Sequence, residues 1–454
     1  MPGASKLNST KNTAVASAQH VRAQNIDDAP NDGAQSCKVA LIGFGTVGSS
    51  VARILCERSI THLRLTHILN RNVARKKVDW LPSSVQWTED IDDVLSSDVE
   101  IVVEVMGGLK PTEDWIRRAL ESGKSVVTAN KQLIARHGPE LIALARRMKQ
   151  QIEFGASVAG GVPVISGLHE GLAGDELFKV CGILNGTCNY ILSQIESTGI
   201  PFATALREAQ KLGFAEADPS EDIDGLDARA KLTILARVAL HCKVSAENIS
   251  ARSISAIDSI DFEYANQLGC TIRQISWAEL REESKDANLF AAVQPALVEL
   301  SSPLARVEGS QNLVMATGKY GGETVFGGHG AGGHPTAVAV VSDILAIARV
   351  KEAGMSCAVQ PIEKTPTVTA DFITKHYLRF MVMDRPGIIA SLATILSQCG
   401  INIDAVVQKP GCPKSHLPFL ITLEECKTSL VEQALQQINS LDFLVQPSLH
   451  LPIL

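Results

Sequence analysis

Apolar and polar positions alternate in blocks along the chain, and these blocks predict two kinds of element in turn. Four continuous apolar runs predict buried strands, at residues 38–45, 63–69, 99–108 and 122–131. Three stretches with apolar residues three or four apart predict helices, at residues 47–58, 111–122 and 139–151. Such alternation is typical of a parallel sheet covered by helices, so residues 36–164 are predicted to form an α/β domain.

The pattern changes character after this region. Residues 165–350 mix strand-like segments, such as 177–186 and 289–300, with longer helices, which favours an α+β domain. The region ends with a glycine cluster and a turn into a strongly apolar helix. We therefore expect a second domain with a different architecture from the first.

Three further segments complete the predicted organisation. Residues 351–374 are biased toward Pro, Thr and Lys and are predicted to be a linker. In residues 375–454 a strand, a turn, a helix and a second strand follow one another before further strand and helix segments, which predicts a βαββαβ module. Residues 1–35 are small and polar and are predicted to be a disordered tail.

Charge and cysteine usage exclude several classes of partner and site. The net charge of −7 argues against nucleic acid or an anionic membrane as a partner, because both call for a basic surface. No uninterrupted apolar run approaches the roughly 20 residues of a membrane span. The ten cysteines show neither a C-x-x-C pair nor metal-ligand spacing, which predicts free thiols and no zinc. A reducing compartment, the cytoplasm, is the resulting expectation.

The first predicted strand runs into the pattern Gly43-x-Gly45-x-x-Gly48, and a helix follows. In this strand–turn–helix setting the pattern predicts a Rossmann dinucleotide-binding site. Gly43 permits the tight turn, Gly45 lets the backbone approach the pyrophosphate, and Gly48 allows close packing of helix on strand. Thr46 and Val47 lie where the turn meets the helix, whose N-terminus faces the negative charge, and are expected to bind the cofactor. A tight turn without a ligand is the alternative.

Cofactor preference is read about 20 residues later, where an NAD-specific site carries Asp or Glu for the ribose 2′-hydroxyl. No acidic residue occurs between Glu57 and Asp79. Arg71 lies just after the second predicted strand, beside Asn70 and ahead of more basic residues, and would suit a 2′-phosphate. NADP is therefore favoured, with use of NAD left open, because loop bases are also commonly solvated.

Asp227 and Lys231 lie one turn apart on a predicted helix and pose a choice between an ordinary surface ion pair and chemistry. We expect Arg229, Thr233 and Arg237 to form the solvated face of this helix, with Asp227 and Lys231 on the other side. A charge pair on the apolar side of a helix costs stability, so its presence there favours a functional role.

Hydride transfer to or from a nicotinamide requires a group that exchanges a proton with the substrate oxygen, and a lysine can do so. Lys131 follows a predicted strand at the carboxyl edge of the sheet, where ligands bind in open α/β folds, although a solvated loop lysine is equally consistent. The acidic stretch 216–227 suits a cationic group such as an amino-acid ammonium, with a solvated loop as the alternative.

Six stretches together resemble the homoserine dehydrogenase family over residues 38–350: "GFGTVG", "EVMGG", "TANK", "NGTCNYIL", "GFAEADPSEDIDGLDARAKL" and "GAGGHPTAVAVVSD". The resemblance implies reversible NAD(P)-dependent oxidation of L-homoserine to L-aspartate 4-semialdehyde, in threonine, methionine and isoleucine synthesis. It also implies a set of site residues. The catalytic lysines would be Lys131, which also faces the cofactor, and Lys231; the substrate would meet Asn185, Gly186, Thr187, Glu216, Asp222 and Asp227; Gly332 would approach the cofactor.

Three positions depart from the family pattern. His329 stands where the family usually has proline, and Cys188 stands in place of a threonine. Gly155 stands where the family typically has a glutamate that helps to coordinate a structural sodium ion. The remaining sodium ligands would be the carbonyls of Val158, Gly160 and Val162. Without the carboxylate, the presence of the ion is left open, because a hard cation prefers carboxylate and carbonyl oxygens together.

The C-terminal stretch "MDRPGIIASLATILSQCGINIDAVVQ" resembles an ACT domain. This resemblance implies association into homodimers or homotetramers and feedback by an amino acid, with threonine the leading candidate; a domain that only oligomerises is the alternative. Two other functions stay open: another ACT-containing NAD(P)-dependent hydroxy-acid dehydrogenase, and a non-catalytic sensor of nucleotide and amino acid. The paired lysines favour the homoserine dehydrogenase reading.

Overall fold

The computed structural model describes residues 36–58, 60, 62–283, 286–354 and 364–454. The predicted tail, residues 1–35, and much of the predicted linker lie outside the described residues. Every cysteine within the described part of the chain is a free thiol, as expected.

The first sheet confirms the predicted Rossmann topology. Its six strands are all parallel and follow the order β3-β2-β1-β4-β5-β6. The strands are β1 (Cys37–Ile42), β2 (Leu63–Leu69), β3 (Gln86–Thr88), β4 (Ile101–Glu104), β5 (Ser125–Thr128) and β6 (Ile152–Glu153). Strand order reverses between β1 and β4, so the crevice for a ligand lies at the carboxyl ends of these two strands.

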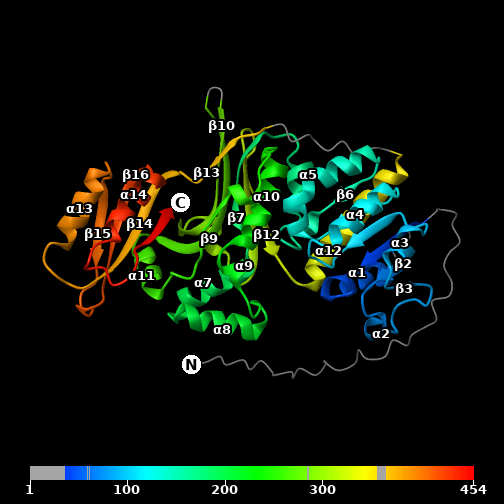
Figure 1. Cartoon of the computed structure of the whole chain (residues 1–454), viewed down its shortest axis with the longest axis horizontal. Helices are drawn as coiled ribbons and strands as arrows, with labels where there is room; N and C mark the ends of the chain where they lie inside the picture. Colours follow the sequence, from blue (N-terminus) through cyan, green and yellow to red (C-terminus); the bar gives the residue numbers. More distant parts are fainter. Residues whose placement is uncertain (1–35, 59, 61, 284–285, 355–363) are drawn as a thin grey trace, which may run out of the picture. The chain divides into compact units, whose positions relative to one another are not determined.

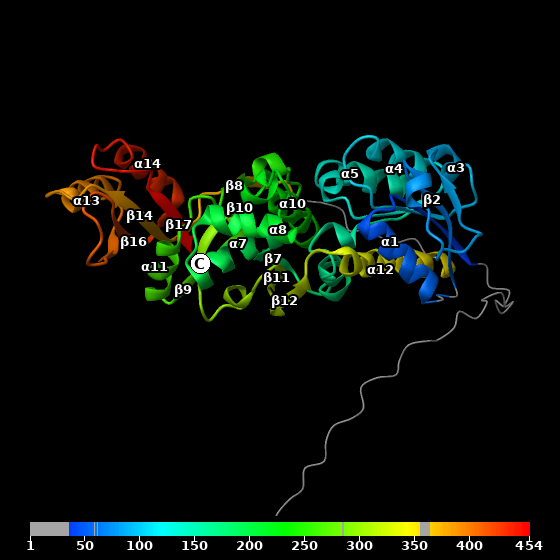
Figure 2. The same cartoon turned by 90° about the horizontal axis from the view of Figure 1, so that it is seen from below.

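Helices cover both faces of this sheet (Figures 1 and 2). On one face lie α3 (Ile91–Leu95), α4 (Thr112–Glu121) and α5 (Lys131–Arg147), and on the other lie α1 (Thr46–Glu57) and α12 (Gly333–Glu352). Along β1, Ala40 and Ile42 pack toward the first set, whereas Val39 and Leu41 pack toward the second. Because both faces are covered, the strand is apolar at successive positions rather than at alternate ones.

Helix α12 belongs to this first sheet although it follows the second domain in sequence. It packs along α1 and buries Val340, Val341, Ile344 and Ile347 against the sheet. By length and composition α12 is the one helix within the described ranges that could cross a membrane. Its apolar side is instead part of a protein core, so its hydropathy is explained by packing.

The second sheet has eleven strands and contains more strands than the sequence pattern predicts. β7 (Leu177–Ile183) and β10 (Asp286–Glu299) match expected segments, whereas the long β9 (Cys270–Glu283), β11 (Gln311–Gly318) and β12 (Gly322–His329) do not. These five strands run side by side as β12-β11-β7-β9-β10 and pair antiparallel throughout. The short strands β8 (Ser250–Ala251) and β13 (Thr367–Thr369) pair with β10; the latter lies in the segment predicted to be a linker.

The same sheet continues into the C-terminal module. The order β17-β14-β16-β15, with two helices, confirms the predicted βαββαβ arrangement. The elements are β14 (Ile373–Val382), α13 (Ile388–Gln398), β15 (Ile403–Gln408), β16 (Leu417–Lys427), α14 (Thr428–Ile438) and β17 (Leu449–Ile453). One face of this part of the sheet carries α13 and α14, and the other meets α11 (Ser259–Gln267) of the preceding region (Figure 1).

Candidate active site

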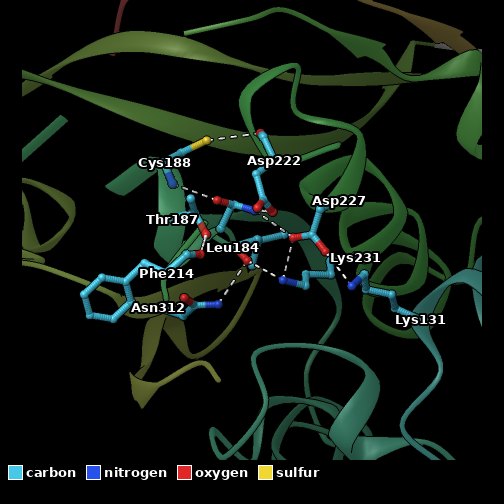
Figure 3. Close-up of polar contacts among 10 residues, drawn as sticks. Lys131, Leu184, Thr187, Cys188, Phe214, Asp222, Asp227, Lys231 and Asn312 are labelled. Atoms are coloured by element: carbon cyan, nitrogen blue, oxygen red, sulfur yellow. Dashed lines mark hydrogen bonds and ion pairs between the residues drawn. The ribbon is translucent and has the colours of Figure 1, made fainter. Parts of the chain in front are cut away.

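A buried carboxylate that contacts two lysines forms the centre of the candidate site. Asp227 is the second residue of α10 (Leu226–Leu240) and is 4% exposed. Its Oδ2 lies 2.7 Å from Nζ of Lys231, one turn later, and its Oδ1 lies 2.8 Å from Nζ of Lys131 (Figure 3). One aspartate therefore holds two ammonium groups from different helices.

The Rossmann domain supplies Lys131 at the edge where ligands are expected. β5 ends at Thr128, and α5 begins at Lys131, eight residues before the predicted start of this helix. Asn130 caps the helix: its side-chain oxygen accepts a hydrogen bond from the backbone N–H of Leu133. Lys131 is thus the first residue of a capped helix rather than a loop residue, and α5 packs against α10.

Asn185 fixes the acidic side of the cluster. It precedes α7 (Gly186–Thr198), and its Oδ1 accepts a hydrogen bond from the backbone N–H of Cys188. Its Nδ2 donates to Oδ1 of Asp222 over 2.7 Å and to Oδ2 of Asp227 over 3.0 Å. One amide therefore caps a helix and connects the two carboxylates.

Charges around the cluster shift the pKa values in opposite directions. Burial raises the pKa of Asp227, but Lys231 and Lys131 outweigh burial and hold it well below its usual range. Burial lowers the pKa of Lys131, but Asp227 overcomes that effect, so the pKa of Lys131 is raised. Burial raises the pKa of Asp222. The free site thus favours a charged Asp227 and a charged Lys131.

Both lysines retain hydrogen-bonding capacity for a ligand. An ammonium has three N–H donors. Lys231 uses two of them, on Asp227 and on the backbone carbonyl of Leu184 at 2.8 Å, and Lys131 contacts Asp227. The side chains of Lys131 and Lys231 are 35% and 14% exposed, so both are accessible. Such a pair can donate to, or exchange a proton with, one substrate oxygen.

The glycine turn after β1 has the geometry expected of a dinucleotide site. Gly43 has φ +100°, which favours glycine, and a Cβ on Gly48 would lie 2.1 Å from the carbonyl oxygen of Gly43. A Cβ on Gly45 would meet nothing within 4 Å, so open space faces that backbone. Thr46 and Val47 begin α1. The turn therefore fits a pyrophosphate over the helix N-terminus.

The other residues predicted to bind the cofactor, Arg71 and Gly332, follow β2 and precede α12, respectively. Arg71 follows β2 and is exposed, while Asn70 accepts a hydrogen bond from the backbone N–H of Phe44 over 3.3 Å. Gly332, with φ +111°, precedes α12. A Cβ on the following Gly333 would lie 2.9 Å from Oγ of Ser50, so the N-termini of α1 and α12 are close together.

The structure does not bring every predicted substrate residue into the cluster. Glu216 is exposed, and within the described part of the chain its carboxylate makes no hydrogen bond or ion pair. Thr187 donates its hydroxyl to the backbone carbonyl of Phe214 over 2.7 Å. Gly186 starts α7, and a Cβ there would lie 2.6 Å from the carbonyl oxygen of Ser310.

The predicted solvated face of α10 is wrong. Thr233 is fully buried and donates to the carbonyl of Arg229. Arg237 donates to the carbonyls of Val244 and Ile134. Because α5, β7 and β9 pack against this helix, Thr233 and Arg237 donate to backbone carbonyls.

The predicted sodium ligands line a segment without a side-chain carboxylate at position 155. Val158 and Val162 are buried, and Gly160 has φ +51°. The backbone N–H of Gly155 donates to Asp343 over 2.8 Å, and a Cβ on Gly155 would lie 2.7 Å from the other oxygen of that carboxylate. Burial raises the pKa of Asp343 to about 7. The Asp343 carboxylate therefore lies beside Gly155, although residue 155 itself supplies no charged ligand, and the sodium site stays a prediction.

Of the two other departures, the structure explains Cys188 and offers no explanation for His329. Cys188 is fully buried, and its thiol donates to the backbone carbonyl of Asp222 over 3.1 Å, which ties the acidic turn to α7. Burial raises the pKa of this thiol well above its ordinary value, so it is a structural donor and not a nucleophile. His329 is exposed, and its backbone carbonyl accepts a hydrogen bond from Gly161 over 3.2 Å.

Two contributors to the site are missed by sequence reasoning: the backbone carbonyl of Leu184 and the side chain of Asn312. The carbonyl accepts hydrogen bonds from Nζ of Lys231 and from Nδ2 of Asn312 (Figure 3). No sequence motif marks either residue. The only signal is Asn312 itself, a polar residue on the face of β11 that is otherwise buried and apolar at Val314 and Ala316.

Comparison with known proteins identifies all three regions. Residues 43–155 match the family model "Homoserine dehydrogenase, NAD binding domain", residues 163–345 match "Homoserine dehydrogenase", and residues 376–443 match "ACT domain". Homoserine dehydrogenase of Bacillus subtilis is 36% identical over 419 residues, covering 90% of this chain and 96% of the relative.

Two solved structures show the same likeness. A homoserine dehydrogenase from Thiobacillus denitrificans superposes with a TM-score of 0.85 at 33% identity, covering 92% of this chain and 98% of the other. A hyperthermophilic archaeal homoserine dehydrogenase in complex with NADPH gives a TM-score of 0.59 at 28% identity, covering 70% and 98% of the two chains.

Proposed function

The chain belongs to the homoserine dehydrogenase family, and on that premise we propose that its two clustered lysines act on the oxygen of the substrate. The activity is the NAD(P)-dependent interconversion of L-homoserine and L-aspartate 4-semialdehyde. The observation that carries the proposal is the single carboxylate of Asp227 contacting both ammonium groups.

Lys231 is the proton carrier in this proposal. Oxidation removes a hydride from the carbon that bears the hydroxyl and a proton from the hydroxyl oxygen; reduction returns both. When bound, the nicotinamide accepts or supplies the hydride. Two N–H groups of Lys231 are held by Asp227 and by the carbonyl of Leu184, so the third position on Nζ exchanges the proton. In reduction the ammonium donates its third N–H to the substrate oxygen, and in oxidation the neutral amine accepts the hydroxyl proton at the same position.

Lys131 stabilises charge on the same oxygen. Its raised pKa, caused by Asp227, keeps it an ammonium over a wide pH range. A fixed ammonium beside the reacting oxygen stabilises the alkoxide character that develops during hydride transfer. Both lysines contact Asp227, and neither uses all three of its N–H groups in the contacts with Asp227 and Leu184, so both can still donate to that oxygen.

The acidic turn provides the other end of the substrate site. Asp222, whose Oδ1 accepts a hydrogen bond from Asn185, is proposed to accept from a substrate ammonium, together with Glu216 of the same acidic stretch. Gly186 and Thr187, at the N-terminus of α7, line the side that receives the substrate carboxylate. The substrate would thus be held at both of its charged amino-acid groups.

The preferred cofactor in this proposal is NADP, with NAD also accepted. Support comes from Arg71 in the position where an NAD-specific site carries an acid, and from the NADPH complex of the archaeal relative. Comparison of kcat/KM for NADP and NAD in the wild type and in Arg71→Ala tests this. Loss of the NADP preference in the variant supports the role of Arg71, and an unchanged ratio contradicts it.

The domain boundaries and the assembly belong to the same proposal. We infer a nucleotide-binding domain at 36–164, a catalytic domain at 165–350 and an ACT domain at 375–454, with threonine as the effector of the ACT domain. The ranges of the three matched family models support the boundaries, and the ACT match supports an amino-acid effector in general. A homodimer or homotetramer in the cytoplasm is the expected form.

The decisive experiment measures NADP-dependent oxidation of L-homoserine by the full chain, with and without threonine, beside the variant Lys231→Ala. We expect turnover by the wild type, loss of turnover in the variant with nucleotide binding retained, and inhibition by threonine. A fully active variant contradicts the role of Lys231. Unchanged activity in the presence of threonine contradicts the effector assignment.

A further inference from the structure

Asn312 is a buried polar residue that contacts the lysine cluster indirectly. It is the second residue of β11 and is 2% exposed. It lies on the same face of the strand as the buried apolar residues Val314 and Ala316. Antiparallel pairing of β11 with β7 places it across from Leu184, just beyond the last strand residue of β7. Its Nδ2 donates to the carbonyl of Leu184 over 3.0 Å.

The same carbonyl anchors Lys231. It accepts from Nζ of Lys231 over 2.8 Å while it accepts from Asn312, so both lone pairs of this oxygen are used (Figure 3). The orientation of the Asn312 amide follows from this contact, because the opposite orientation would place two acceptor oxygens against each other. The Oδ1 of Asn312 therefore points away from Leu184.

That oxygen lies beside the glycine turn that precedes α12. A Cβ on Gly330 would lie 2.3 Å from Oδ1 and 2.1 Å from Cγ of Asn312, so the backbone of the turn rests against the amide. Oδ1 is buried without a hydrogen-bond partner among the described residues. One side chain thus touches both the anchor of Lys231 and the turn expected to approach the cofactor.

Asn189 provides an internal comparison that separates burial from position. It is also fully buried, its Nδ2 donates to the carbonyls of Val307 and Gly309, and its Oδ1 also lacks a partner. Neither of those carbonyls accepts from a lysine of the cluster. An unpartnered oxygen is therefore not what distinguishes Asn312; the carbonyl that it shares with Lys231 is.

We propose that Asn312 is a positioning residue for the reaction. By holding the carbonyl of Leu184, it fixes the position of Lys231 relative to the glycine turn. This rests on the role of Lys231 in the proposed function. Asn312 touches no reacting atom. It restricts the carbonyl that fixes Lys231 Nζ, and its contact with Gly330 relates that position to the cofactor side of the site.

The test compares Asn312→Asp with Asn189→Asp in the full chain, by kcat and KM for L-homoserine over a range of pH and by thermal unfolding. In Asn312→Asp the shape is kept and the donor is lost, so we expect kcat to fall about 10- to 100-fold, with a smaller change in KM. The new carboxylate two hydrogen bonds from Lys231 should move the pH limb of kcat upward by about one unit. Asn189→Asp should lower thermal stability without moving the limb.

The outcomes separate this inference from the proposed function. Equal kcat and equal pH limbs in the two variants overturn the positioning role while leaving the function intact. A wild type that does not oxidise L-homoserine overturns both. If Asn312→Asp does not fold, Asn312→Ala beside Asn189→Ala repeats the comparison without a new charge, and an equal loss of kcat in that pair overturns the role of Asn312.

Discussion

Two buried carboxylates in this molecule are held by cationic side chains, but they differ in what the cations have left to offer. Asp227, in the candidate active site, contacts Lys131 and Lys231, which are partly exposed and retain free N–H groups. Asp261, on α11 at the junction with the ACT module, is fully buried against Arg379.

The junction cluster is closed on every side. Oδ1 of Asp261 accepts from Nε of Arg379 and from the hydroxyl of Tyr377, both over 2.7 Å, and Oδ2 accepts from the backbone N–H of Asp258. Arg379 also donates to the carbonyl of Ala256. One anion balances one cation, and burial outweighs the pairing so that the pKa of Asp261 is raised.

The difference identifies which cluster can act on a ligand. At Asp227 two ammonium groups share one carboxylate, both remain accessible, and both keep N–H donors for a substrate oxygen. At Asp261 the charges cancel, and the arginine is only 3% exposed. A buried ion pair by itself is therefore weak evidence for function; spare donors and access to solvent are the informative features.

The largest effect should follow from removing the proton carrier. Lys231→Met is expected to lower kcat by about 10²- to 10⁴-fold, because the substrate oxygen loses its proton partner. Asp227 keeps Lys131 and Asn185 as partners, so the fold should persist. Steady-state kinetics and thermal unfolding measure the two effects separately. A large loss of stability with normal kcat per folded molecule would place this cluster with the structural one.

The reverse result is expected at the junction. Asp261→Asn leaves Arg379 buried without its counter-charge and should cost about 3–5 kcal/mol in the free energy of unfolding. The kcat of the folded fraction should stay at the wild-type value. Denaturant unfolding measures the loss. The matched control is Glu263→Gln, at a residue of the same helix as Asp261. It removes the exposed carboxylate that pairs with Lys409 and should change stability little.

The charge balance of the active-site cluster can be tested by pH. Asp227 is the main cause that raises the pKa of Lys131, so Asp227→Asn should lower that pKa. Neutral Lys131 would then form at lower pH. The alkaline limb of the kcat profile, where Lys131 loses its proton, should therefore move downward by about one pH unit or more. The pH dependence of kcat for wild type and variant decides the matter; an unmoved limb means that Asp227 does not tune the lysines.

The smallest effect concerns a histidine pair at the same junction. His376 and His450 lie 3.0 Å apart through Nδ1 and Nε2, and burial lowers the pKa of both below the ordinary value. Stability from the neutral pair is present above about pH 6.5 and is lost as the pH falls, with a slope near 1.4 kcal/mol per pH unit for each extra proton bound by the unfolded chain.

Thermal unfolding between about pH 5 and pH 7.5 measures this slope. His450→Asn should make the transition less sensitive to acid, whereas Lys231→Met should leave that sensitivity unchanged because it lies in the other cluster. Equal acid sensitivity in the wild type and in His450→Asn would show that the histidine pair does not cause the loss of stability at low pH.

Much of the fold follows from local pattern. The continuous apolar runs at β1 and β2 and the glycine turn after β1 predict a parallel, doubly covered sheet with a dinucleotide turn, because the turn chemistry is local. β9, β11 and β12 escape prediction because their identity depends on antiparallel partners far away in sequence. The face of α10 that the sequence predicts to be solvated is covered for a similar reason, because α5, β7 and β9 come from distant parts of the chain.

What the sequence by itself determined is the set of reactive groups: a nucleotide turn, two lysines and an acidic stretch suited to an amino-acid substrate. Only the tertiary structure decided how they combine. Asp227 meets Lys231 within one helical turn, but it meets Lys131 only because α5 packs against α10. The carbonyl of Leu184 and the amide of Asn312 are 128 residues apart and become neighbours through the pairing of β7 with β11. Side-chain chemistry is local, whereas register between distant strands depends on the whole core.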